Sequence, residues 1–308
     1  MNDRLVLYHC PCADGAFAAW AIYLTVQDKR EFGVSTGFKA HYPTQRLSVE
    51  DLPLKLEGTL ILLDYCPPSD WVLACCQRFR EVLIWDHHKT TQEMLDDGGC
   101  WPSNLSWAMD PHRSGCAIAR RQSGTPPLPE HQAALFDYVE DNDLWLHKMP
   151  ESKAVTAGLQ ARNIEYDVYK NPRLFDQLAE LRVNDLMAEG AALFQKREAL
   201  VRQYASQLQC KELDVSGDPA DGMVRVVYCS EITPSDFAVI SDLGHQLASV
   251  NPDNIGAVVM FDEATGKLRI SLRSVRGTDC SPLAKRFGGG GHAQSCGFSL
   301  YREEWDKL

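Results

Sequence analysis

Residues 82–90 read VLIWDHHKT, which places one carboxylate and two imidazoles directly after an apolar run. The run VLIW has the length and composition of a buried strand. We therefore expect Asp86, His87 and His88 to stand at the end of a strand, where metal ligands and proton-transfer groups usually act. The triplet indicates a functional site only if other parts of the chain bring matching ligands to the same place.

Two earlier strand candidates share this property, because each is followed by potential metal ligands. An apolar run at 5–8 is followed by HCPCADG at 9–15, and a second run at 59–63 is followed by Asp64. Helix-like segments lie between these strands, and such alternation predicts a parallel sheet with helices on its faces. Since the carboxyl ends of parallel strands form one edge of a sheet, we expect the polar groups to converge there.

The groups expected at this edge are carboxylates, imidazoles and one thiol: His9, Cys12, Asp14, Asp64, Asp86, His87 and His88. An acidic cluster at 140–143, after a helix candidate, is a further source of ligands. Carboxylates mixed with imidazoles suit manganese, iron, cobalt or zinc. Two metals about 3.5–4 Å apart, bridged by a carboxylate, are a recurring device for cleaving phosphate esters. Taken singly, Asp14 reads as a helix cap, His9 as a core histidine and Asp64 as a turn residue.

The second half of the chain predicts a long helix and a second, smaller α/β domain. Residues 184–208 have helical periodicity, and a strand, a helix and a hairpin across 256–273 follow. The predicted fold class is therefore α/β, with the active site in the cleft between the two domains. The predicted parts are a parallel-sheet, metal-binding catalytic domain at 1–180, a helical connector at 181–209 and a substrate-binding domain at 210–308.

Near the C-terminus, four consecutive glycines precede a histidine in FGGGGHA, residues 287–293. Glycine lets the backbone approach a ligand closely, and successive N–H groups can cradle an anion. Strand periodicity also places Lys267, Arg269 and Arg273 on one face of the predicted hairpin. A basic face beside a glycine-rich turn predicts a grip for phosphate or a nucleotide. The alternatives are a solvated face and a flexible linker.

Composition narrows the class of protein. The 308 residues carry a net charge of -11, which argues against wholesale binding of long nucleic acid. Eleven cysteines without a CxxC pair suit free thiols in a reducing cytosol. No apolar run approaches about 18 residues, and the first residues lack the layout of a signal peptide. We expect a cytoplasmic protein with no membrane association and no obligate protein partner.

On these motifs the chain resembles the DHH phosphoesterase family. The family's first four motifs are matched, in order, by His9 with Asp14, by Asp64, by Asp86-His87-His88 and by Asp141. The run at 288–292 and the pair Arg273-Ser274 are similar to the GGGH-type motif and the Arg-Ser element of the DHH-associated C-terminal domain. The resemblance covers nearly the whole chain and extends to oligoribonucleases, pAp phosphatases and RecJ-like proteins.

The resemblance implies two divalent metal ions, for which we expect manganese. His9 and Asp64 would bind one ion, and Asp14, His87 and Asp141 the other, with Asp64 bridging. His88 would contact the scissile phosphate or protonate the leaving group, and Asp86 would orient the histidines. The nucleotide or phosphate end of the substrate would be held by Arg273, Ser274, Gly289, Gly290, Gly291 and His292.

The chain departs from the family pattern in the first motif. Cys12-Ala13-Asp14 stands where the family usually has Asp-x-Asp. A thiolate ligand from Cys12 would favour cobalt, zinc or iron at that site, whereas otherwise Cys12 merely lines the site. In the fourth motif, Asp143 is the alternative to Asp141.

The predicted function is metal-dependent hydrolysis of phosphodiester or phosphomonoester bonds by two-metal, in-line attack of hydroxide. The acidic chain favours short nucleotidic substrates such as nanoRNA, pAp or dinucleotides, and an exonuclease of either polarity falls within this class. Two alternatives stay open. One is a pyrophosphatase or polyphosphatase that uses the same centre, and the other is a non-catalytic DHH-type scaffold that binds nucleic acid or protein.

Overall fold

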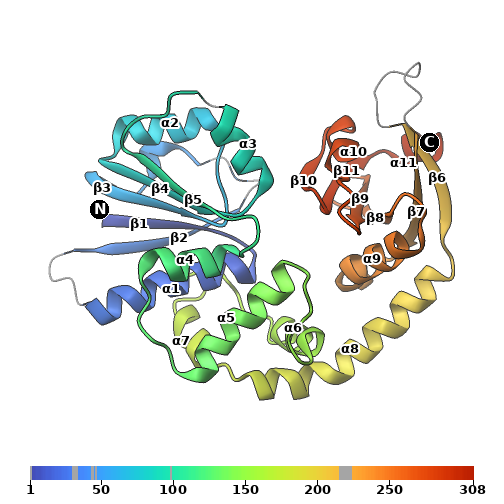
Figure 1. Ribbon diagram of the computed structural model, residues 1–308, viewed down its shortest axis with the longest axis horizontal. Coiled ribbons are helices and arrows are strands. Elements are labelled where there is room, and N and C mark those ends of the chain that lie inside the picture. The colour runs from blue at the N-terminus through green and yellow to red at the C-terminus, as the bar shows by residue number, and fades with distance from the viewer. Residues whose placement is uncertain (1, 30–33, 43–44, 46, 98, 215–223) are drawn as a thin grey trace. The chain divides into compact units, whose positions relative to one another are not determined.

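The computed structural model describes residues 2–29, 34–42, 45, 47–97, 99–214 and 224–308. The chain divides into two compact units, Met1–Leu193 and Phe194–Leu308 (Figure 1). The chain passes from one unit to the next within the long helix α8, Val183–Ala205, which is the helix expected at 184–208. The cleft expected between the two domains stays a prediction.

The first unit is built on a five-stranded sheet with the order β2-β1-β3-β4-β5. All of its strand pairs are parallel, which confirms the expected sheet. The strands are β1 (Asn2–His9), β2 (Thr36–His41), β3 (Leu54–Leu63), β4 (Glu81–Asp86) and β5 (Leu105–Met109). The apolar runs of the central strands, residues 5–8 of β1 and 60–63 of β3, are buried on both faces, because helices cover each side of the sheet.

Each face of this sheet has its own core and its own helices (Figure 1). On one face α1 and α4 pack against Tyr8 and Leu63, and the ring of Trp20 stacks on that of Phe136 at 5.2 Å. On the other face α2 and α3 pack against side chains such as Leu62. The helices are α1 (Ala13–Lys29), α2 (Ser69–Arg78), α3 (Lys89–Asp97), α4 (Gly115–Ser123), α5 (Glu130–Asp143), α6 (Ser152–Ala161) and α7 (Leu174–Glu180), with a short 3-10 helix η1 (Val49–Asp51).

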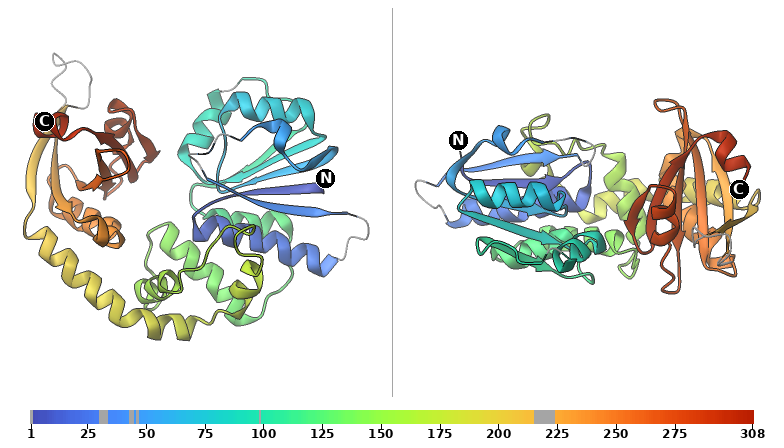
Figure 2. Two further views of the ribbon diagram at one scale, coloured as in Figure 1. Left: turned by 180° about the vertical axis from the view of Figure 1, so that it is seen from behind. Right: turned by 90° about the horizontal axis from the view of Figure 1, so that it is seen from above.

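The second unit contains a six-stranded mixed sheet with the order β10-β11-β9-β8-β7-β6. Helix α9 and the end of α8 cover one face, and α10 and α11 cover the other (Figure 2). The expected hairpin is β8–β9, closed by a turn in which Gly266 has a φ of +67°. The elements are β6 (Gln209–Asp214), β7 (Val224–Ile232), η2 (Pro234–Val239), α9 (Ile240–Val250), β8 (Ile255–Asp262), β9 (Lys267–Ser274), α10 (Ser281–Arg286), β10 (Gly290–His292), β11 (Ser295–Leu300) and α11 (Arg302–Asp306).

The fold class is thus the predicted one, a parallel-sheet unit followed by a smaller mixed α/β unit. Among the described residues, no helix is both long enough and apolar enough to span a bilayer.

Candidate metal centre

The polar residues predicted at the strand ends are brought together at the carboxyl edge of the first sheet. Asp64 directly follows β3, and Asp86 is the last residue of β4. Within the first unit, the described residues form three groups, and in each group the ligand atoms all lie within 4.8 Å of one another. They are His9 with Cys12 and Asp64, Asp14 with His87 and Asp143, and Asp64 with Asp86, His87 and His88.

Asp64 belongs to two of these groups and contacts His87, which belongs to the third. Its carboxylate lies 3.4 Å from His9 Nδ1, 3.2 Å from His87 Nε2 and 3.9 Å from His88 Nδ1. The side chain is buried, and its φ of 56° falls in the left-handed region that favours glycine. Such backbone strain is found where the surrounding structure fixes it, often at a functional site. The strain here aims one carboxylate at three imidazoles.

Asp14 and Asp143 approach the same imidazole from two different helices. Asp143 Oδ2 lies 3.5 Å and Asp14 Oδ2 3.9 Å from His87 Nε2. The buried Asp14 also accepts hydrogen bonds from the backbone N–H groups of Gly115 (2.6 Å) and Cys116 (2.9 Å) at the start of α4. It therefore caps the neighbouring helix α4, whereas in α1 it is the second residue and not the cap that the sequence suggested.

Gly115 is a residue of the site for which the sequence offered no signal. A Cβ at this position would lie 2.7 Å from Asp64 Cβ and 2.9 Å from Asp14 Oδ2. Only glycine lets the start of α4 approach the two carboxylates this closely.

Asp86 serves the histidines rather than the shared centre. One of its oxygens accepts hydrogen bonds from the backbone N–H groups of His87 (2.7 Å) and His88 (3.3 Å) and lies 2.6 Å from His88 Nδ1. The other oxygen accepts a hydrogen bond from Thr91 Oγ1. Because both oxygens of this fully buried carboxylate are engaged, its geometry fits the orienting part expected for it.

The acid expected from the fourth motif was Asp141, with Asp143 as the alternative. In the structure Asp143 lies with Asp14 and His87, and Asp141 is in none of the ligand groups of the first unit. The buried Asp141 carboxylate instead accepts hydrogen bonds from the backbone N–H groups of Lys148 (2.8 Å) and Met149 (3.3 Å). Those bonds hold the loop that follows α5, in which Trp145 has a φ of 54°. Asp141 is thus committed to the backbone, and Asp143 is the ligand candidate.

Cys12 lies with His9 and Asp64, as expected for a ligand or a lining residue. Burial, followed by the negative charges of Asp64, Asp143 and Asp14, raises the pKa of the Cys12 thiol well above its usual value. The thiol therefore keeps its proton at neutral pH, and a cation bound by its sulfur would have to displace that proton.

The acids and histidines of the centre perturb one another strongly. Burial and the charges of Asp64 and Asp143 raise the pKa of Asp14 well above its usual value, and burial raises that of Asp143 to about 6 although His87 opposes the shift. Burial alone would lower the pKa of His87, but the Asp64 carboxylate beside it raises it to about 10. Acids that crowd together in this way, the buried Asp14 and the more exposed Asp143, are stabilised by a cation.

The donor set fits divalent metal ions. Asp64 Oδ1 and His9 Nδ1 are buried and have no hydrogen-bond partner among the described residues. Buried polar atoms are normally satisfied, so two such atoms on neighbouring side chains point to a ligand. A mixture of carboxylate, imidazole and thiol donors suits borderline metals such as manganese, cobalt, zinc or iron.

His41 is a second residue of this edge that the sequence analysis missed. It ends β2, pairs in register with His9 and packs its ring 4.5 Å from that of Tyr65. The side chain is buried, its Nε2 has no hydrogen-bond partner among the described residues, and burial lowers its pKa to about 4. The segment 36–41, TGFKAH, gave no strand signal because it contains a glycine and a lysine among few apolar residues.

In the second unit, the glycine-rich run and part of the basic face of β9 line a polar hollow of about 700 Å³. Gly288, Gly289 and Gly290 form one side, and Lys267 and Arg269 contribute the cations. A Cβ at position 289 would lie 1.9 Å from the carbonyl oxygen of Gly297, so the backbone packs tightly there. Gly291 and His292 continue the run as β10 and pair with β11.

The Arg-Ser pair does not line this hollow, and its expected contact with the substrate stays a prediction. Arg273 donates hydrogen bonds to the carbonyl oxygen of Leu272 (2.8 Å) and to Ser241 Oγ (3.0 Å) of α9. The buried Ser274 hydroxyl donates to the carbonyl oxygen of Thr278 at 2.6 Å. The pair therefore fastens β9 to α9 and to the following turn, and the cations of the hollow come from further along the same face.

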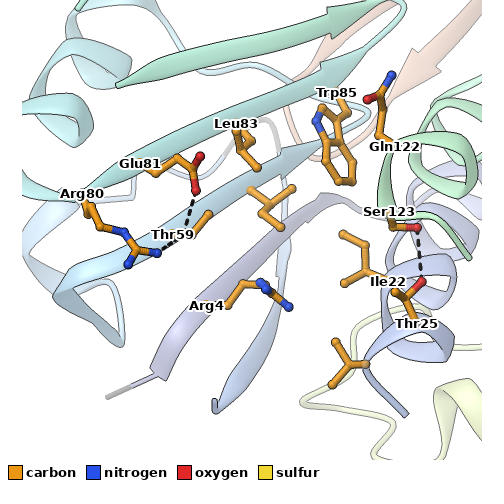
Figure 3. Close-up of a pocket in the computed structure, with 12 residues that line it drawn as sticks. Arg4, Ile22, Thr25, Thr59, Arg80, Glu81, Leu83, Trp85, Gln122 and Ser123 are labelled. Atoms are coloured by element: carbon orange, nitrogen blue, oxygen red, sulfur yellow. Dashed lines mark hydrogen bonds between the residues drawn. The ribbon is translucent and has the colours of Figure 1, made fainter. Parts of the chain in front are cut away.

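A separate hollow of about 270 Å³ lies at the amino ends of the same parallel strands, on the face that α1 and α4 cover (Figure 3). Arg80 donates to Thr59 Oγ1 at 3.1 Å, and Thr59 donates to Glu81 at 3.0 Å. On the helix side, the hydroxyls of Thr25 and Ser123 lie 3.3 Å apart. This hollow is at the opposite end of the sheet from the ligand groups, so we regard it as distinct from the metal centre.

Comparison with known proteins agrees with this organisation. The DHHA1 domain family matches residues 224–308. An uncharacterised protein of Acanthamoeba polyphaga mimivirus is 23% identical over 307 residues, which cover 96% of this chain and 67% of that protein.

Solved structures share the fold at low identity. The pGpG-specific phosphodiesterase PggH from Vibrio cholerae superimposes with a TM-score of 0.50 and 14% identity over 99% of this chain and 95% of its own. CDC45 from Entamoeba histolytica does so with a TM-score of 0.52 and 8% identity over 99% and 93%. Residues 224–308 thus match the DHHA1 domain, and they follow a parallel-sheet unit, which is the order of domains expected from the resemblance to the DHH phosphoesterase family.

Proposed function

We propose that the chain is a metal-dependent hydrolase of phosphate esters in short nucleotidic substrates. The observation that carries the proposal is the position of Asp64. Its strained backbone aims a buried carboxylate at His9 and His87, and its Oδ1, although 3.2 Å from His87 Nε2, makes no hydrogen bond of normal geometry with the described residues. A carboxylate shared by two sets of donors is what a pair of bridged metals requires.

The residues present would hold two ions. His9, Cys12 and Asp64 would form one set, and Asp14, His87 and Asp143 the other, with Asp64 reaching the second set through its contact with His87. Divalent ions bound there supply Lewis acidity, which polarises phosphoryl oxygens and makes hydroxide available at neutral pH. Manganese fits a set of carboxylates and imidazoles, whereas a sulfur donor from Cys12 favours cobalt, zinc or iron.

The remaining polar residues of the edge would position the phosphate. The contact of His88 Nδ1 with Asp86 fixes the orientation of the His88 ring. The ring would then hydrogen-bond an oxygen of the scissile phosphate or deliver a proton to the leaving alcohol. Asp86 acts through His88 and His87 and is a positioning residue.

The nucleotidic character of the substrate rests on the second unit. The hollow offers the Lys267 and Arg269 cations beside the backbone of Gly288–Gly290, which is a set of groups that binds phosphate. Its volume of about 700 Å³ accommodates a nucleotide. The net charge of -11 disfavours a long polyanion. PggH is named for pGpG, which is a dinucleotide and thus a short substrate of the kind proposed here. This supports testing dinucleotides first.

The test is hydrolysis of a substrate panel by the purified chain with manganese, cobalt or zinc. We expect 5′-phosphorylated dinucleotides and RNA of a few residues to be cleaved, with pAp, pyrophosphate and a long single strand as comparisons. Faster cleavage of pyrophosphate or polyphosphate than of any nucleotide would overturn the substrate class. Binding of RNA without hydrolysis under any of these metals would overturn the enzymatic proposal.

A matched pair of variants ties the activity to the proposed centre. Asp64→Asn should abolish hydrolysis. Asp110→Asn is the control, because Asp110 follows β5 at the same edge but belongs to none of the three ligand groups. Equal losses in both variants would assign the activity to general damage at this edge or to a contaminant.

A further inference from the structure

Two cysteines of the second unit are in direct contact beneath the glycine-rich run. The sulfur atoms of Cys280 and Cys296 lie 3.1 Å apart. Both side chains are buried, and both thiols are free. Cys280 immediately precedes α10, and Cys296 is in β11. The contact between the sulfur atoms therefore joins the start of α10 to the sheet.

Cys280 is also fastened to the turn between β10 and β11. Its backbone N–H donates to the carbonyl oxygen of Ala293 at 2.8 Å, and its thiol donates to the same oxygen at 3.2 Å. With that donation made, the thiol hydrogen of Cys296 points at the Cys280 sulfur. The hydrogen bond from Cys296 lowers the pKa of Cys280, which favours the thiolate form.

Cys296 is packed against the glycine-rich run itself. It pairs in register with Gly291, and a Cβ at position 291 would lie 3.0 Å from Cys296 Cβ. Cys296 also lines the polar hollow together with Gly288–Gly290 and Arg269. The segment between the two cysteines, residues 281–295, contains α10 and all four glycines. A covalent change at these two sulfur atoms would therefore move residues that line the hollow.

We propose that Cys280 and Cys296 form an oxidisable dithiol, whose conversion to a disulfide by a hydroperoxide weakens the hold of the adjacent hollow on its ligand. One thiolate attacks the terminal oxygen of the peroxide, so that an S–O bond forms and the O–O bond breaks, and the expelled hydroxide or alkoxide takes up the proton that the thiol lost and leaves as water or an alcohol. The second sulfur attacks the sulfenic acid, an S–S bond forms and water leaves. Two thiols and one hydroperoxide thus give a disulfide, water and the alcohol or second water derived from the peroxide.

The effect on the hollow follows from how tightly its wall is packed. A disulfide has an S–S distance of about 2.05 Å, so the two sulfurs must approach by about 1 Å. Cys296 then shifts relative to Gly291, and Gly297 shifts with it. The carbonyl oxygen of Gly297 lies against Gly289 with no room for even a Cβ, so the movement reaches the glycines that line the hollow. Two cysteines that served only as core filling would lack this consequence.

The first experiment detects the bond and does not depend on the proposed function. The native chain is treated with hydrogen peroxide, free thiols are alkylated, and tryptic peptides are analysed by mass. Cys280 and Cys296 fall in separate peptides, residues 277–285 and 287–302, each with a single cysteine. We expect these two peptides to be linked and the link to disappear with dithiothreitol. The exposed Cys100 and Cys210 report that the oxidant has acted. Oxidation of Cys100 and Cys210 without the linked pair overturns the proposal.

The second experiment measures the consequence and rests on the proposed hydrolysis of a 5′-phosphorylated dinucleotide. After removal of the peroxide, oxidised protein should show a KM raised at least about fivefold, with kcat changed much less, and dithiothreitol should reverse this. Cys296→Ala and Cys280→Ser should be insensitive to the treatment. Cys229→Ser, which removes another buried thiol of the same unit, should stay sensitive.

The outcomes separate cleanly. A linked pair with an unchanged KM overturns the coupling to the hollow. A linked pair in a protein without hydrolytic activity overturns the proposed function and leaves the dithiol intact, and fluorescence-detected binding of the labelled dinucleotide then takes the place of KM. If Cys280→Ser fails to fold, Cys296→Ala and the peptide analysis of the native chain still decide.

Discussion

Two polar clusters, at opposite ends of the strands β3 and β4, differ in whether their groups have hydrogen-bond partners. At the amino ends, Arg80, Thr59 and Glu81 form a chain in which each donor meets an acceptor (Figure 3). At the carboxyl ends, Asp64 and His9 each keep a buried polar atom without a hydrogen-bond partner among the described residues. The comparison indicates that the Asp64 and His9 atoms are set aside for a ligand, because buried polar atoms are normally satisfied and the same strands satisfy the Arg80, Thr59 and Glu81 groups.

The backbone at the carboxyl end is strained as well. Asp64 has a φ of 56° and is therefore strained by about 1–3 kcal/mol. The acids near His87 add mutual repulsion, since burial and neighbouring charge raise the pKa of both Asp14 and Asp143. Sites of this kind commonly lower stability in exchange for function. Substitutions at the carboxyl end should therefore affect activity much more than stability, and substitutions at the amino end should do the reverse.

The largest effect is expected for Asp64→Asn. Activity should fall at least about a hundredfold, because the shared carboxylate serves both sets of donors. The melting temperature measured in EDTA should fall only modestly, because His87 loses the carboxylate that raises its pKa to about 10, while one negative charge beside the buried Asp14 also disappears. Steady-state kinetics and thermal unfolding check the two halves of this statement. A variant that unfolds much earlier than the native chain in EDTA would show that Asp64 is part of the structural framework.

The next largest effect separates Asp143 from Asp141, two acids of the same helix. Asp143→Asn should lower activity by about tenfold or more with little change in unfolding free energy. Asp141→Asn should cost about 1–2 kcal/mol of stability, because an amide cannot accept both backbone hydrogen bonds that the carboxylate accepts. Kinetics and urea unfolding of both variants measure the difference. The opposite pattern would return Asp141 to the ligand set.

Much of the carboxyl edge was predictable from the sequence because it depends on strand order alone. Asp64, Asp86, His87 and His88 follow apolar runs directly, and parallel strands bring their ends together whatever the details of packing. By the same reasoning, His9 is predicted to lie near Asp64, because His9 also directly follows an apolar run.

What could not be predicted depends on tertiary packing. Asp141 and Asp143 lie two residues apart at the end of α5, and the turn that follows decides which faces His87 and which holds the backbone. Alternation put Arg273 on the correct face of β9, but not whether that part of the strand would meet α9 or the hollow. Gly115 lies in a different element, and its role depends on how closely α4 approaches the acids.

A smaller effect is expected for the metal preference set by Cys12. Cys12→Asp replaces a sulfur donor by oxygen, so the ratio of activity with manganese to activity with zinc should rise by about tenfold if the thiolate is a ligand. Cys12→Ser is the control, because it removes the thiolate without supplying a carboxylate. Both are checked by activity and by metal content after dialysis against each ion. If neither variant changes the ratio, Cys12 only lines the site.

The smallest effect is expected at the satisfied end of the sheet. Thr59→Val keeps the shape of the side chain and removes both the acceptor of Arg80 and the donor to Glu81. Because the Arg80 side chain is exposed and Glu81 is partly so, water can replace the lost bonds, and the cost should be about 1 kcal/mol or less. Hydrolysis should be unchanged in KM and kcat, since the hollow lies at the opposite end of the strands from Asp64. A loss of activity in this variant, measured beside its urea unfolding, would mean that the two ends of the sheet are coupled, and the division between a stable end and a functional end would then fail.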